Sequence, residues 1–125
     1  ARVFGVSGDD VLRADANQEA RDGDVALIDG TLARQGSKDM VDEAAKLAAM
    51  KRIVTTAKLT DLGQTDLIIE AATERETIKQ AIFDDLLPHL KPDTILTSNT
   101  SSISITRLAS RTDRPERFMG FHFMN

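Results

Sequence analysis

Residues 98–102, with the sequence SNTSS, bring hydroxyl and amide side chains together directly after a short apolar run. Such groups can donate to and accept hydrogen bonds from an oxygen-rich ligand. The same residue types also form ordinary turns and helix caps. By itself, the cluster therefore leaves a ligand site and a structural turn equally open.

His122 stands two residues after Gly120, near the end of the sequence. An imidazole changes its charge near neutral pH and can exchange a proton with a substrate hydroxyl. A single histidine without a visible partner is more often structural. His89 lies in the segment PHLKP without an arranged acidic or nucleophilic neighbour, so we interpret it as a surface residue.

Three charged residues follow expected strands, where open parallel sheets bind their ligands. Glu74 and Lys79 stand at the start of a helix, where they can meet a nicotinamide ribose or phosphates, or simply form a solvated first turn. Asp15 ends a short strand, where a carboxylate can accept hydrogen bonds from an adenosine ribose. Alternatively, Asp15 or Asn17 caps the helix that follows.

The strands that must position these side chains are short and apolar. Residues 53–57, 67–71 and 94–98 have this composition, and a final strand is expected at 118–123. The run LIIEA at 67–71 is of the near-continuous kind that is buried on both faces of a parallel sheet.

Helices are expected between these strands. Thr73 and Glu76 fit a capping box that opens an amphipathic helix running to about Pro88. Ser101 and Ser102 are candidate caps for a short helix after them. The second half thus alternates strand and helix, as a parallel α/β sheet does.

The first half is organised differently. Residues 2–7 and 11–15 are β-prone runs separated only by the turn formers at 8–10, which is a hairpin signal. Residues 16–35 and 39–52 then have helical periodicity and are expected to form a helical hairpin.

Composition limits the remaining possibilities. With 125 residues and 41% apolar content, the chain is expected to form a single domain, residues 1–125. The net charge of −4 comes from interspersed charges, so nucleic acid is not an expected partner. No apolar run approaches the roughly 20 residues that cross a bilayer, and we expect a cytoplasmic protein without a membrane partner. Two histidines without cysteine make a transition-metal site unexpected.

The run from Asp66 to Asn125 carries a family resemblance. The order IEAATE, a helix, DTILTSNTSSISITRLA and then RPERFMGFHFMN resembles the 3-hydroxyacyl-CoA dehydrogenases, including the 3-hydroxybutyryl-CoA dehydrogenases. The resemblance implies an α/β fold, a three-layer Rossmann-like sandwich with a mostly parallel sheet of five or six strands. It also implies NAD-dependent oxidation of 3-hydroxyacyl-CoA to 3-oxoacyl-CoA in fatty acid or hydroxybutyrate metabolism.

The resemblance further implies residue roles, with NAD as cofactor and an acyl-CoA as substrate. His122 takes the place of the acid/base that acts on the 3-hydroxyl, while Ser101 and Asn125 take those of substrate contacts. The implied cofactor contacts are Gly8, Asp15, Glu74, Lys79 and Asn99.

The N-terminal region departs from the family. GVSG resembles the opening strand and first glycine but runs directly into DDVLRAD, so the rest of the G-x-G-x-x-G loop and the first crossover helix, about sixteen residues, are expected to be missing. Backbone N–H groups of that loop anchor the pyrophosphate, so weak NAD binding is expected. Residues 8–10 would permit only an antiparallel hairpin, unless a strand is exchanged with another chain.

The family's carboxylate partner for the histidine, and its helical domain, lie beyond Asn125, so we expect this chain by itself to be catalytically inactive. Two alternatives stay open. One is a non-enzymatic scaffold, remodelled or engineered by deletion, that self-associates through exposed sheet surface as a homodimer. The other is that a segment between Gly8 and Asp9 is missing from the sequence as written, in which case the hairpin argument falls and NAD binding recovers.

Overall fold

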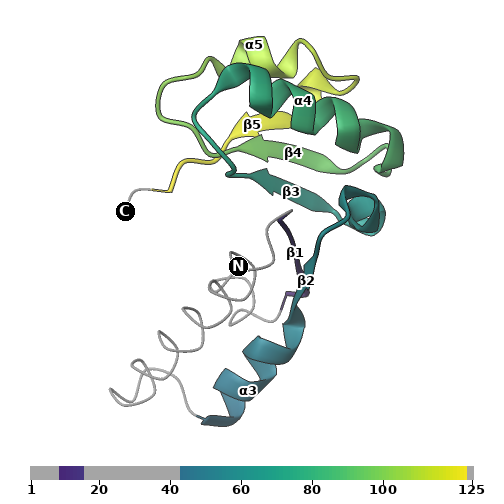
Figure 1. Cartoon of the computed structure of the whole chain (residues 1–125), viewed down its shortest axis with the longest axis vertical. Coiled ribbons are helices and arrows are strands. Elements are labelled where there is room, and N and C mark those ends of the chain that lie inside the picture. The colour runs from purple at the N-terminus through teal and green to yellow at the C-terminus, as the bar shows by residue number, and fades with distance from the viewer. Residues whose placement is uncertain (1–8, 16–42, 124–125) are drawn as a thin grey trace. The chain divides into compact units, whose positions relative to one another are not determined.

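The computed structural model describes residues 9–15 and 43–123. The strand expected at 2–7, the helix expected at 16–35 and the first residues of the helix expected at 39–52 lie outside this part of the chain. The chain divides into two compact units, residues 1–58 and 59–125 (Figure 1).

The described residues of the first unit form two strands and one helix: β1 (Val11–Ala14), α3 (Glu43–Arg52) and β2 (Ile53–Thr56). Ala49 of α3 and Ile53 of β2 are buried together, and Val11 and Met50 pack against them. These contacts hold the helix against the start of the strand pair.

The strand pairing in this unit corrects one expectation. β1 pairs with β2 in parallel, with Val11 opposite Ile53 and Ala14 opposite Thr56. The antiparallel hairpin expected around residues 8–10 is therefore wrong for Val11–Ala14. A tight turn joins strands that are close in sequence, whereas parallel partners are separated by a long connection. The turn residues at 8–10 therefore gave no information about β2, the partner of β1.

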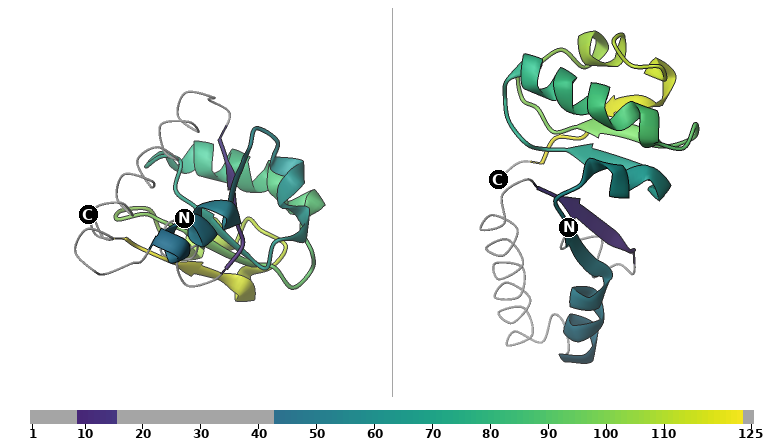
Figure 2. Two further views of the ribbon diagram at one scale, coloured as in Figure 1. Left: turned by 90° about the horizontal axis from the view of Figure 1, so that it is seen from below. Right: turned by 45° about the vertical axis from the view of Figure 1, so that its right-hand side comes forward.

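The second unit has a three-stranded parallel sheet with the strand order β3-β4-β5. Helices α4 and α5 run along one face of this sheet (Figures 1 and 2). Its elements, in chain order, are η1 (Leu59–Gln64), β3 (Leu67–Glu70), α4 (Glu76–Leu86), η2 (Leu87–His89), β4 (Ile95–Ser98), α5 (Ile105–Ala109), η3 (Pro115–Arg117) and β5 (Phe118–Gly120).

The core of the second unit lies between the sheet and these helices. Leu96 of β4 is 0% exposed, and Phe83 and Leu86 of α4 are each 2% exposed. The ring of Phe83 meets that of Phe118 edge to face, with centroids 5.1 Å apart, a geometry that aromatic pairs favour. This contact fixes α4 above the strand that leads to His122.

The strands expected at 53–57, 67–71 and 94–98 are confirmed, each one residue shorter, and the strand expected at 118–123 is confirmed over its first half, Phe118–Gly120. All strand pairs among the described residues are parallel, as a Rossmann-like α/β fold requires.

Both expected helix caps are wrong. The N-cap of α4 is Arg75, without a side-chain hydrogen bond, and Glu76 instead accepts hydrogen bonds from Arg107. The N-cap of α5 is Ser104, whose hydroxyl oxygen accepts a hydrogen bond from the amide of Arg107 at 3.2 Å. Ser101 and Ser102 instead donate hydrogen bonds to Glu74.

Candidate functional site

The carboxyl ends of β3, β4 and β5 lie at one edge of the second unit's sheet, because the three strands are parallel. Backbone hydrogen bonds continue past the strand ends, from Asn99 N to Glu70 O at 2.7 Å and from Phe121 N to Ser98 O at 3.1 Å. Such edges are where open α/β sheets bind their ligands. The segments that follow the three strands therefore form the candidate site.

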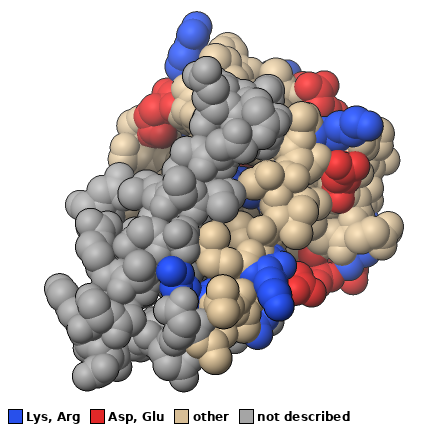
Figure 3. All heavy atoms as spheres, turned by 60° about the horizontal axis from the view of Figure 1, so that its bottom comes forward, with Lys and Arg blue, Asp and Glu red and all other residues tan. Residues whose placement is uncertain are grey.

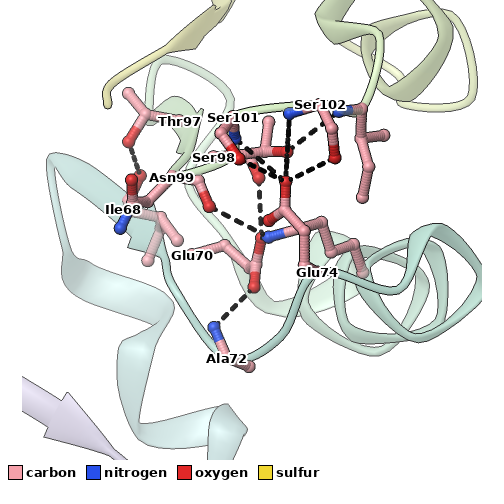
Figure 4. A network of polar contacts seen from close by, with 12 residues as sticks. Ile68, Glu70, Ala72, Glu74, Thr97, Ser98, Asn99, Ser101 and Ser102 are labelled. Carbon is pink, nitrogen blue, oxygen red and sulfur yellow. Dashed lines mark hydrogen bonds and ion pairs between the residues drawn. The ribbon is translucent and has the colours of Figure 1, made fainter. Parts of the chain in front are cut away.

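Glu74, in the segment after β3, accepts hydrogen bonds from the segment after β4 through its carboxylate (Figure 4). Its Oε1 accepts hydrogen bonds from the amides of Ser101 at 2.9 Å and Ser102 at 3.1 Å, and from the Ser102 hydroxyl at 2.9 Å. The hydroxyl of Thr100 donates to the same oxygen. One carboxylate oxygen thus fixes the conformation of residues 100–102.

These donors also set the charge of Glu74. The hydroxyl of Thr100, followed by the hydroxyl and amide groups of Ser102 and Ser101, lowers the pKa of Glu74 from 4.5 to about 2. Hydrogen bonds donated to a carboxylate favour its ionised form. Glu74 is therefore negatively charged at every physiological pH.

Lys79 lies beneath this surface rather than on it. Its side chain is 0% exposed, and its Nζ donates to Glu70 Oε2 at 2.6 Å and to the main-chain oxygen of Asn99 at 3.2 Å. Sequence reasoning placed Lys79 among the cofactor contacts. The structure gives it buried partners from the ends of β3 and β4 instead.

Asn99 joins the segments that follow β4 and β5. Its Oδ1 accepts a hydrogen bond from the amide of Phe123 at 3.2 Å. Phe123 is the neighbour of His122, which is exposed and follows the end of β5. The structure therefore brings the segment with His122 to the same sheet edge as Ser101 and Glu74.

The remaining predicted residues are distributed as follows. Asp15 belongs to the first unit and directly follows β1, where its amide donates to Thr56 O at 3.0 Å. Gly8 and Asn125 lie outside the described residues.

Sequence reasoning missed Glu70 as a residue of the site. Glu70 closes the otherwise apolar strand β3, and its residue is only 4% exposed. A charged residue is almost never buried unless it is paired. A carboxylate ending a buried-type strand was therefore the signal for a buried partner, which is Lys79.

Acidic and basic side chains are interspersed on the described surface seen in Figure 3. Among residues 9–15 and 43–123, no group of three or more His, Asp or Glu side chains is arranged to hold a metal ion. In the same ranges, no helix has the length and apolar content needed to span a membrane.

The parallel strands, their covering helices and the polar segments at the carboxyl ends define a Rossmann-like α/β domain. The whole chain, residues 1–125, matches the family model "3-hydroxyacyl-CoA dehydrogenase, NAD binding domain". The chain belongs to the 3-hydroxyacyl-CoA dehydrogenase family, as its NAD-binding domain.

Relatives and solved structures agree with this assignment. The chain is 52% identical to a 3-hydroxybutyryl-CoA dehydrogenase from Bradyrhizobium diazoefficiens, covering 100% of this chain and 43% of that protein. The crystal structure of (S)-3-hydroxybutyryl-CoA dehydrogenase from Ralstonia eutropha matches with a TM-score of 0.95 and 39% identity, over 99% of this chain and 44% of that one. The corresponding Escherichia coli structure has a TM-score of 0.95 and 35% identity, over 99% and 26%. The chain thus spans less than half the length of these proteins.

The Bradyrhizobium match bears on the expected loss of residues between Gly8 and Asp9. It runs over 125 residues and includes all 125 residues of this chain, so it has no gap of about sixteen residues, the length expected from the Rossmann crossover. The comparison therefore lends no support to an internal loss, or to the weak NAD binding argued from it.

The residues present suit NAD, the cofactor of this domain family. Asp15 follows β1 and can accept hydrogen bonds from a ribose. Ser101 and Ser102 are exposed at the sheet edge of the second unit and carry hydroxyl groups suited to an oxygen-rich ligand.

Proposed function

We propose that this chain provides the NAD-binding half of an enzyme that oxidises 3-hydroxyacyl-CoA to 3-oxoacyl-CoA, and that residues 1–125 form a single domain. The observation that carries the proposal is the match of residues 1–125 to the NAD-binding domain of the 3-hydroxyacyl-CoA dehydrogenases. The hydrogen bond between Asn99 Oδ1 and Phe123 N, which holds the His122 segment beside the segment after β4, supports it. The names of the relatives, including two 3-hydroxybutyryl-CoA dehydrogenases of known structure, favour a hydroxyacyl-CoA substrate.

His122 is the proposed acid/base. In the oxidation it accepts the proton of the 3-hydroxyl as carbon 3 loses its hydride, and in the reverse direction it returns that proton. NAD, when bound, supplies the acceptor for the hydride. Ser101 and Asn125 are the proposed substrate contacts, with Ser101 placed on the exposed segment after β4.

The proposed cofactor residues divide by position. Asp15 accepts from a ribose hydroxyl, and Glu74 and Asn99 shape the sheet edge, with Gly8 as a further contact. Lys79 contributes indirectly, because its Nζ is bonded to Glu70 and to the Asn99 carbonyl. We further propose that these 125 residues alone do not catalyse the oxidation, since they correspond to 43% of the length of the Bradyrhizobium enzyme.

Cofactor binding is tested by titrating the chain with NADH and following fluorescence or heat. We expect a dissociation constant in the range of about 1 μM to 1 mM, typical of enzyme ligands. Asp15→Ala is expected to weaken binding, whereas Asp66→Asn, in an exposed ion pair with Lys91, serves as the matched control and leaves it unchanged. Absence of binding at millimolar NADH would favour the non-enzymatic scaffold.

The reaction is tested in a chimera that completes this chain with the remaining sequence of the Bradyrhizobium enzyme. We expect NAD-dependent oxidation of 3-hydroxybutyryl-CoA, and His122→Asn is expected to lower kcat by about 10²- to 10⁴-fold, the usual contribution of a general acid/base. Equal activity of the His122→Asn chimera would remove His122 from the mechanism.

A further inference from the structure

Glu70 is a buried carboxylate at the corner where β3 ends. The Glu70 side chain is 2% exposed, and its partner Lys79 is 0% exposed. The carboxylate accepts three hydrogen bonds, from the Ala72 amide at 2.7 Å, the Lys79 ammonium at 2.6 Å and the Ser98 hydroxyl at 2.7 Å. It thereby links the segment after β3, helix α4 and the end of β4 (Figure 4).

Stability alone does not account for this ion pair. Removing two charges from water is costly, and replacement of a buried pair by apolar residues of similar volume is often neutral or stabilising. Phe83 and Leu86, on the same side of α4 as Lys79, already supply an apolar interior there. A buried pair that is hydrogen-bonded to several chain segments is suited to fixing one geometry.

Hydrogen bonds connect this ion pair to the segment after β5. Lys79 Nζ, held by Glu70, donates to the carbonyl oxygen of Asn99 at 3.2 Å. The amide of Asn99 donates to Glu70 O at 2.7 Å. The N–H of Asn99 is thus held by β3, and its carbonyl is held by Lys79. The Asn99 side chain then accepts from the amide of Phe123 at 3.2 Å.

We infer that Glu70 is a positioning residue that acts through Lys79 and Asn99 to hold the segment bearing His122. The Glu70 carboxylate is buried and accepts hydrogen bonds from Ala72, Lys79 and Ser98, so it acts on the site through these protein groups. The inference deepens the proposed function, since the importance of the His122 position rests on the proton transfer assigned to it.

The test is nuclear magnetic resonance on the 125-residue chain carrying Glu70→Gln together with Lys79→Met. Gln keeps an acceptor for Ala72 and Ser98, while the two buried charges are removed together. We expect a melting temperature within about 5 °C of the parent, since no buried charge is left unpaired. We expect amide exchange at Phe123 to become at least about tenfold faster, and the ring signals of His122 to shift, as the local hold is lost.

The matched control is Asp66→Asn with Lys91→Met, which removes an ion pair of the same unit whose side chains are 94% and 31% exposed. It should leave both signals unchanged. A folded Glu70→Gln, Lys79→Met variant with parental Phe123 exchange and His122 signals would overturn the inference.

A second variant covers the case in which the double substitution prevents folding. Asn99→Ala cuts only the last hydrogen bond of the path, at a half-buried position. Faster Phe123 exchange supports the last link of the path, from Asn99 to Phe123, and unchanged exchange overturns the inference. None of these readouts needs NADH or substrate, so a failure of the proposed cofactor binding would be seen separately.

Discussion

Glu74 Oε1 lies 2.9 Å from the amide nitrogen of Ser101, so a residue that precedes α4 determines the conformation of the segment after β4. The same oxygen accepts hydrogen bonds from the amide and the hydroxyl of Ser102. Because these are hydrogen bonds to an ionised carboxylate, they depend on pH.

The first prediction follows from the sign of this dependence. The pKa of Glu74 in the folded chain is about 2, below its ordinary value of 4.5. Its stabilising contribution is therefore complete above about pH 4.5 and is lost as the pH falls toward 2. Amide signals of Ser101 and Ser102, followed by nuclear magnetic resonance, should titrate with a midpoint near 2.

Glu74→Gln should abolish that titration, because no carboxylate then remains beside the two amides. Asp84→Asn, at an exposed position of α4, is the control and should leave the midpoint unchanged. A midpoint at the ordinary value of 4.5 in the parent would contradict the hydrogen bonds seen here.

The second prediction concerns the aromatic contact beneath the site. Phe83→Leu removes the edge-to-face pair with Phe118 and should lower the free energy of unfolding by about 1–3 kcal/mol, measured by urea denaturation. Ile78→Ala, on the exposed side of the same helix, should change it by less than about 1 kcal/mol. Equal losses at the two positions would argue against Phe83 as a core residue.

The third prediction concerns a close backbone approach. A Cβ at Gly63 would lie 2.7 Å from the carbonyl oxygen of His89, which cannot move without displacing η2. Gly63→Ala should therefore destabilise the chain by about 1–3 kcal/mol, the usual cost of overpacking.

Gly120→Ala provides the comparison for Gly63. Its added Cβ would meet Ile105 Cγ1 at 3.2 Å, and a side chain can adjust more readily than a backbone carbonyl. Thermal unfolding of both variants should show the larger loss at Gly63. The reverse order would mean that the backbone at His89 yields more easily than expected.

The fourth prediction tests the cap of α5. Ser104→Ala removes the hydroxyl that accepts from the Arg107 amide and should cost about 1 kcal/mol in urea denaturation. Thr106→Ala, at an exposed position inside the same helix, should be neutral or slightly stabilising, because alanine is the better helix former. A neutral Ser104→Ala would show that this short helix is held by its packing alone.

The strands of the second unit were predictable because each is a short apolar run bounded by polar or turn residues. The partner of β1 was not, since the pairing of Val11 with Ile53 joins segments whose connection leaves no local trace in either strand. Hydrophobic pattern identifies a strand and its buried character, but pairing across a long connection depends on tertiary packing.

The site was predictable to a similar extent. Glu74, Asn99 and Ser101 were expected near a ligand, and the structure places them at one sheet edge. Lys79 was assigned to the surface, although helical spacing puts it on one side of α4 with Phe83 and Leu86. That spacing, together with the charge of Glu70 in a buried strand, would have identified the internal pair.

The strand order β3-β4-β5 carries a consequence for how this part of the chain assembles. Among residues 59–123, each strand of this sheet pairs with the strand before or after it in sequence, with Leu67 opposite Ile95 and Leu96 opposite Phe118. Residues 71–94 connect β3 to β4 and residues 99–117 connect β4 to β5, and both connections are shorter than residues 15–52 between β1 and β2. Closing a shorter connection costs less chain entropy. The sheet that carries Glu74, Ser101 and His122 can therefore form in the order of synthesis, each new strand adding to a finished edge.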